Sequence, residues 1–199
     1  MLDAGVAAYI PGGIDPARRD EMGHLTAQVI LKETRATGDP QMVAQLLRLV
    51  ESQGIDELAE LWANAAPDTL PGTLWRLYAL QQATRSEGEQ AAHWYRLGLP
   101  TAQVAGVVAG VVEPPTPQHL ERVIDEVLSG FFTGDLAVAL ERAAAYARVL
   151  VTGIALDADA RDLDDKTHSV SMTKVAANMQ QLATQLEWSA KLWRKGELL

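Results

Sequence analysis

Residues 169–195 read SVSMTKVAANMQQLATQLEWSAKLWRK, and this stretch holds the most regular pattern in the chain. Apolar or small side chains recur there in alternating steps of three and four residues, at Met172, Val175, Met179, Leu182, Leu186, Ser189 and Trp193. Heptad spacing of this kind lines one face of a helix with an apolar stripe. It predicts a long final helix that packs lengthwise against another helix and ends at Gly196.

The stripe fits two kinds of partner. It suits the last helix of a bundle within one chain, and it suits equally a helix that pairs with its copy in another subunit. Ser189 interrupts the seam, and three heptads stand at the margin for a coiled coil. Both interpretations therefore stay open. The candidate oligomerisation residues are Met172, Val175, Met179, Leu182, Leu186 and Trp193.

Upstream of this stretch the chain reads as helix after helix. Pro- and Gly-rich breakers separate segments of helical period. The valines of 101–112 favour a strand, but the length and alanines of that segment favour a buried helix. We therefore expect an all-α protein, a compact bundle of about eight helices plus a C-terminal amphipathic helix. The expected bundle helices are 15–37, 40–53, 56–66, 73–86, 89–97, 101–112, 117–131 and 134–153.

A length of 199 residues allows roughly one domain. Its expected parts are an N-terminal arm at 1–14, a helical domain at 15–153, an acidic loop at 154–168 and the C-terminal helix at 169–199. The loop is inferred from a cluster of aspartates at Asp157, Asp159, Asp162, Asp164 and Asp165. An oxygen-rich loop suggests calcium, but Arg161, Asp162 and His168 stand where an EF-hand needs an oxygen ligand, glycine and glutamate.

Composition excludes several classes of function. The formal net charge is −9, which argues against a strongly basic nucleic-acid binder, because phosphate contacts need clustered lysine and arginine. The absence of cysteine excludes thiol chemistry and cysteine-ligated metals. The most apolar stretch, 104–112, is too short to span a bilayer, and residues 1–10 lack a basic signal-peptide start. We expect a cytoplasmic protein without membrane contact.

Signatures of catalysis and cofactor binding are missing. Phosphate-binding and dinucleotide-binding glycine patterns do not occur, and neither does the nucleophile elbow of serine hydrolases. Glu21 with His24 and Glu89 with His93 have helical spacing, but a di-iron site needs two Glu-x-x-His motifs and further glutamates. We therefore assign no catalytic residue, metal or cofactor. Whether the protein is an enzyme stays open, and these absences favour a non-enzymatic role.

Aromatic side chains concentrate in the middle third of the chain. Such residues usually belong to a core, but together with nearby arginines they also suit a pocket for an apolar or anionic ligand. The candidate ligand-binding residues are Trp75, Arg76, Tyr78, His93, Trp94 and Arg96. A small-molecule binder or enzyme with this pocket is one alternative function.

A DNA-binding transcription-type regulator is the other alternative. Residues 101–129 have the outline of two short helices joined by a turn, of which the second would read DNA. That second helix carries Arg122 beside Glu121, Asp125 and Glu126, a charge balance that phosphates repel. Two bundle helices joined by a proline-rich linker fit the same residues better.

The segments LPGTLWRLY at 70–78 and WYRLGLP at 94–100 resemble small uncharacterised all-helical proteins of high-GC actinobacteria. A usage of 12 arginines against 5 lysines agrees with such a source. The resemblance covers roughly residues 35–155, and it implies an all-helical fold without implying any activity. Our leading expectation is a non-enzymatic helical protein-interaction module whose partner is another protein or a second copy, bound through the C-terminal helix.

Overall fold

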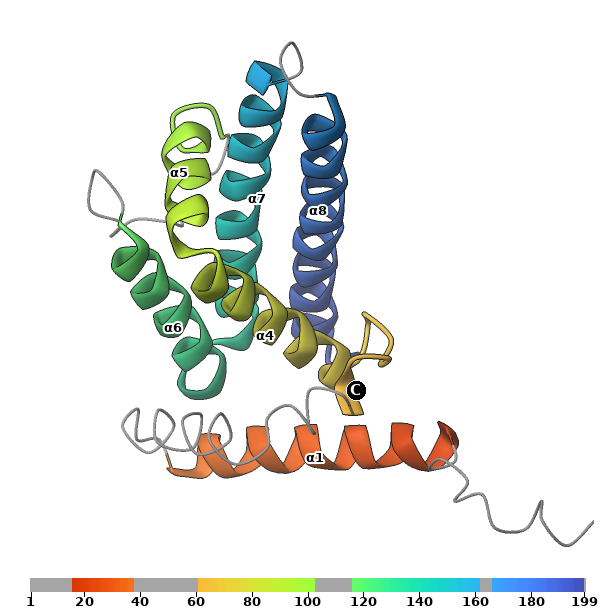
Figure 1. Cartoon of the computed structure of the whole chain (residues 1–199). Helices are drawn as coiled ribbons and strands as arrows, with labels where there is room; N and C mark the ends of the chain where they lie inside the picture. The colour runs from red at the N-terminus through yellow and green to blue at the C-terminus, as the bar shows by residue number, and fades with distance from the viewer. Residues whose placement is uncertain (1–15, 38–60, 103–115, 162–165, 199) are drawn as a thin grey trace, which may run out of the picture.

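The computed structural model describes residues 16–37, 61–102, 116–161 and 166–198 (Figure 1). These ranges contain helices and turns and no strand, so the all-α prediction is confirmed for them. Of the eight expected bundle helices, all of 40–53 and most of 56–66 and 101–112 lie outside the described residues. The described helices are α1 (Pro16–Thr37), α4 (Leu70–Ser86), α5 (Gly88–Gly98), α6 (Pro117–Thr133), α7 (Leu136–Arg161) and α8 (Lys166–Lys195).

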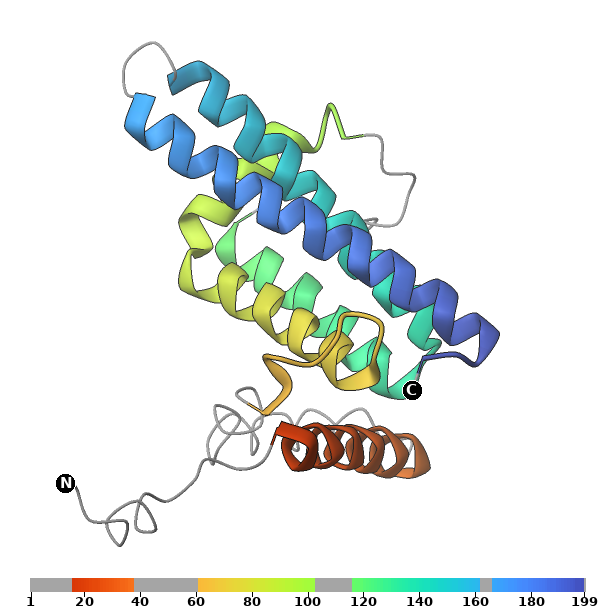
Figure 2. The same cartoon turned by 90° about the vertical axis from the view of Figure 1, so that its right-hand side faces the viewer.

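The last two helices form the centre of the architecture. α7 and α8 run antiparallel and pack along their length, and α4, α5 and α6 lie against them (Figure 2). α1 crosses one end of this bundle and contacts α4 and α6 (Figure 1). Buried leucine, isoleucine, tyrosine and alanine side chains fill the space between the helices. The largest of them are Tyr95, Tyr146, Leu77, Leu80, Leu120, Ile124, Leu136, Leu140, Ile154 and Leu186.

Local side chains explain where several helices begin and end. The Thr69 hydroxyl accepts a hydrogen bond from the amide of Gly72 at 3.2 Å, and Pro71 fits the first turn, so α4 starts at Leu70 instead of residue 73. Thr116 caps α6 in the same way. Gly196, at φ 74°, lets the chain leave α8 as expected, with the Glu197 amide donating to the Leu192 carbonyl.

The expected acidic loop is wrong for residues 154–161, which continue α7 to Arg161. Aspartate disfavours a helix interior because its side chain competes for backbone hydrogen bonds. Asp157 instead binds side chains of α5 and α7, and it is buried. α8 begins at Lys166, three residues before the expected start, so at most the four undescribed residues 162–165 separate the two helices.

Candidate functional site

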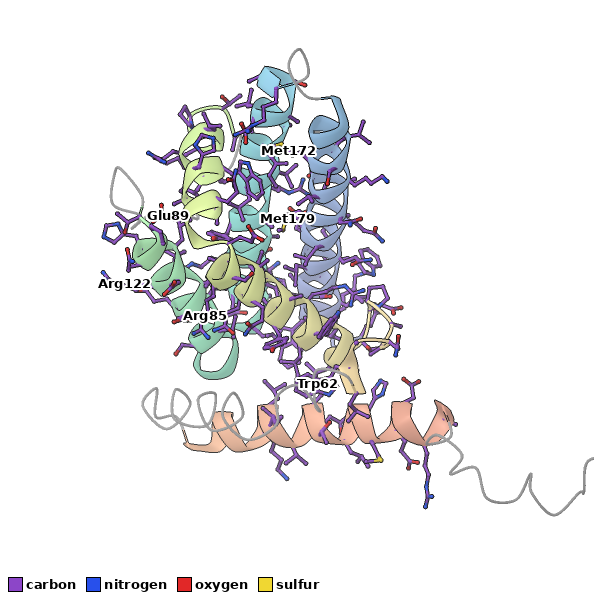
Figure 3. The ribbon with its side chains drawn as sticks, in the orientation of Figure 1. Trp62, Arg85, Glu89, Arg122, Met172 and Met179 are labelled. Atoms are coloured by element: carbon purple, nitrogen blue, oxygen red, sulfur yellow. The ribbon has the colours of Figure 1, made fainter. Side chains whose placement is uncertain are left out.

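The heptad stripe of α8 faces the interior of its own chain. Met172 and Leu186 are buried, and Met179, Leu182 and Trp193 are half-buried against the core. Figure 3 places Met172 and Met179 between α7 and α8. Val175 is the exception, with 41% of its surface exposed. A second copy of α8 could therefore reach most of the stripe only if α8 separated from α7.

Ser189 explains the polar interruption of that stripe. It is fully buried where α8 meets the start of α4. Its Oγ lies 2.9 Å from the Thr73 Oγ1 and 3.2 Å from the carbonyl oxygen of Pro67. A leucine here would leave Thr73 without this partner, so the serine satisfies buried polar groups at a helix crossing.

The six predicted ligand-binding residues divide between two places. On α4, the rings of Trp75 and Tyr78 lie 5.9 Å apart, and Arg76 donates to the Gln185 side chain of α8 at 2.6 Å. Arg96 on α5 is exposed, and its Nε donates to the Ala92 carbonyl. The remaining two, on α5, turn toward α7.

Those two, His93 and Trp94, meet the carboxylate of Asp157. The Trp94 indole donates to Asp157 Oδ2 at 3.0 Å, and the Arg161 guanidinium donates to Oδ1 at 2.8 Å. Gln90 donates at 3.4 Å, and His93 Nε2 lies 3.7 Å from Oδ1. We call these five residues the Asp157 cluster. The Arg161 guanidinium neutralises the buried carboxylate at its centre, so the charges of the cluster are balanced within the chain, and the ligand pocket suggested by the arginines stays a prediction.

The electrostatics of the cluster favour an ionised Asp157. Burial raises the pKa of this carboxyl group, but hydrogen bonds from Arg161 and Trp94 and the charges of Arg161 and His93 outweigh it. The pKa therefore lies below its ordinary value of 3.8. Sequence reasoning could not pair Trp94 with Asp157 across 63 positions, although the spacing from Asp157 to Arg161 is a helical ion-pair spacing.

This lowered pKa predicts an acid-dependent loss of stability. A carboxylate with a lowered folded pKa stabilises the fold above its unfolded pKa, and the contribution is lost as the pH falls through the folded value. Between about pH 5 and about pH 3, wild-type stability should therefore fall more steeply than that of Asp157→Asn. Urea midpoints measured by circular dichroism across this range test the difference.

The matched control for this experiment is Asp159→Asn, because Asp159 is exposed on the same helix. Its urea midpoints should fall in parallel with those of the wild type. Parallel curves for Asp157→Asn would show that the carboxylate contributes nothing to folding through its ionisation.

One apolar surface was missed by sequence analysis. On α1, Met22, Leu25 and Val29 are 45–56% exposed, at the same steps of three and four residues that mark α8. The opposite face of α1 turns toward the bundle, where the Trp62 indole donates to the carbonyl of Gly23 at 3.2 Å (Figure 3). The spacing of three and four residues is present in the sequence. It does not show, however, that α1 has a second apolar face that packs on the bundle and leaves this one exposed.

Neither the Glu–His pairs considered for a metal nor the DNA-binding alternative is supported by the arrangement of the described residues. Within the described ranges, no three His, Cys, Asp or Glu side chains come together to hold a metal ion. His24 instead donates from Nδ1 to the Asp20 carbonyl. Most of the first helix proposed for DNA reading lies outside the described residues, and the exposed surface of α6 mixes Arg122 with Glu126.

Comparison of the chain with protein-family models, with curated proteins and with solved structures finds no match. Among the helices described here, none is both long and apolar enough to cross a membrane.

Proposed function

We propose that this protein is a non-enzymatic helical interaction module that self-associates, and that α1 carries the contact. The observation behind this proposal is that α1 is apolar on two faces. Ala27 and Leu31 are buried toward the bundle, whereas Met22, Leu25 and Val29 are exposed. Apolar side chains gathered on the solvent side of a helix are typical of a surface that a partner covers.

The occupant that we propose is a second copy of α1, lying antiparallel. Glu21 and Lys32 are both exposed, and their separation of eleven positions amounts to about three turns, so they flank the same side of the stripe. Consider an antiparallel pair in which Leu25 packs on Val29 of the second copy. Glu21 of each copy then faces Lys32 of the other copy, so the dimer contains two such pairs. Such isologous pairing is the commonest form of oligomer.

The C-terminal helix supports self-association less well. Its predicted contact residues Met172 and Leu186 are already buried within the chain. Pairing through them would expose the face of α7 that they cover, whereas pairing through α1 disturbs no contact of the described fold.

Light scattering over a range of concentrations tests the proposal. The wild type should form a dimer, and Leu25→Glu should remain a monomer because it buries a charge in the seam. The matched control is Val138→Glu, which makes the same kind of change at an exposed valine of α7 and should leave the dimer intact.

Charge reversal tests the antiparallel register. Glu21→Lys alone and Lys32→Glu alone should each weaken the dimer by about fivefold, and the double variant should recover it. A wild type that is monomeric at every concentration overturns the proposal. A loss of stability in Leu25→Glu would not rescue it, because that loss would mean that another segment of the same chain covers the stripe. A dimer that survives Leu25→Glu places the contact elsewhere and overturns the role of α1.

A further inference from the structure

α8 has a charge opposite to that of the rest of the chain. Its 30 residues contain five basic side chains and a single acid, Glu187, and so carry +4. The whole chain carries −9, which leaves −13 on everything outside α8. Four of the five lysines in the sequence belong to this helix. The basic charge is therefore concentrated on one element of an acidic protein.

The outward side of α8 presents this charge in a regular line. Eight exposed residues follow one another there in alternating steps of four and three, opposite to the buried stripe. None of them is acidic. We call this line the outer stripe, and its members are Val170, Lys174, Ala177, Gln181, Thr184, Trp188, Lys191 and Lys195.

Trp188 is the distinctive member of the outer stripe. It is 49% exposed, and the Lys195 ammonium lies 6.0 Å from the centre of its ring. Tryptophan is enriched among the residues that dominate protein interfaces, because its large ring buries much apolar surface at little entropic cost. Lys174 and Lys191 form no ion pair within the described ranges, so their charges face solvent.

The single acid of α8, Glu187, does not neutralise the lysines of the outer stripe. Glu187 is bound in a two-pronged ion pair by Arg148 of α7, with both N–O distances at 2.7 Å. Arg194 is bound similarly to Glu141 of α7. These pairs lie between α7 and α8. Lys195 lies 4.0 Å from the exposed carboxylate of Glu197, so Lys174 and Lys191 are the lysines of the outer stripe whose charge no described acid compensates.

We propose that the outer stripe of α8 binds an acidic segment of another protein, which sets an apolar side chain on Trp188. The lysines attract the carboxylates of such a segment, and the tryptophan supplies the apolar contact that distinguishes a protein from a purely ionic ligand. This site goes beyond self-association through α1 and uses none of its residues.

Charge distribution favours a short protein segment over nucleic acid or a membrane. α8 is about 45 Å long, whereas charges are screened beyond about 8 Å at physiological ionic strength. A segment laid along α8 stays close to Lys174, Lys191 and Lys195. A DNA duplex or an anionic bilayer is broader, and it would also face the −13 carried by the rest of the protein.

Isothermal titration with two synthetic peptides tests the proposal. Both are acidic helices, one with two leucines a turn apart and the other with alanines in their place. The leucine peptide should bind the wild type, and Trp188→Ala should weaken it by about tenfold. The same variant should change the affinity of the alanine peptide by less than about twofold.

A charge variant and its control complete the experiment. Lys191→Glu should weaken both peptides by about fivefold at low salt. Arg122→Glu makes the same charge change on α6, across the bundle from α8 in Figure 3, and should alter binding by less than about twofold.

Three results would overturn the proposal: no binding of the leucine peptide, equal effects of Lys191→Glu and Arg122→Glu, or tighter binding of a 12-base-pair duplex or phosphatidylserine vesicles. The titrations are carried out on Leu25→Glu as well as the wild type, so that a failure of self-association leaves this test intact.

Discussion

Replacing Gly153 by alanine is expected to lower the free energy of unfolding by about 3 kcal/mol or more. An added Cβ at this position would lie 1.8 Å from the carbonyl oxygen of Trp94, which belongs to the backbone of α5 and cannot rotate away. A Cβ added at Gly98 would likewise lie 2.0 Å from the carbonyl oxygen of Val149. The two glycines thus let α5 and α7 cross with their backbones in contact.

The sign of this effect makes the experiment informative. Gly153 lies inside α7, where alanine would ordinarily stabilise a helix by about 1 kcal/mol. The matched control is Gly130→Ala in α6, where the added Cβ would lie 3.9 Å from the Ala139 side chain in ordinary contact. The control should be neutral or stabilising by up to about 1 kcal/mol in urea unfolding. A stabilised Gly153→Ala would show that α5 and α7 do not cross this closely.

The close crossing also explains why the Asp157 cluster exists. Asp157 lies one turn beyond Gly153 on α7, and Trp94 is the residue whose carbonyl Gly153 approaches. With the backbones this near, the Trp94 indole reaches the carboxylate at 3.0 Å. A wider crossing would leave a buried aspartate without one of its donors, which is costly.

Sequence pattern predicts the helices well because each is set by nearby residues. The stripe from Met172 to Trp193 identifies α8, and Gly196 marks its end. Pattern fails where the hydrogen-bond partner of a side chain cannot be read from the helical period. Asp157 looks like part of a solvated loop until Trp94 and Arg161 are placed around it, and Pro71 looks like a breaker until Thr69 caps the turn that contains it.

Surfaces are harder to predict than helices for a related reason. An apolar stripe shows that one face is covered, but it does not show by what. The stripe of α8 turned out to face α7, whereas Leu25 and Val29 on α1 are exposed. Trp188, inside the same stretch as the heptad, attracts no attention in the sequence because its exposure depends on which face of α8 packs inward.

Leu186→Ala and Val175→Ala should lower the free energy of unfolding by very different amounts, although both residues belong to the same heptad pattern. Leu186 is fully buried in the core, so its truncation should cost about 2–5 kcal/mol of unfolding free energy. Val175 is 41% exposed, so its truncation should cost less than about 1 kcal/mol. Urea unfolding followed by circular dichroism measures both.

The pair decides what the heptad is for. If the stripe packs against α7 within each chain, Leu186→Ala lowers stability at every protein concentration and leaves the oligomeric state unchanged. If the stripe pairs two subunits, Leu186→Ala instead abolishes association, and stability depends on concentration. Val175 is exposed when α8 packs on α7 of its own chain. If Val175→Ala weakened a dimer as much as Leu186→Ala, that result would contradict the antiparallel packing of α7 and α8 within one chain.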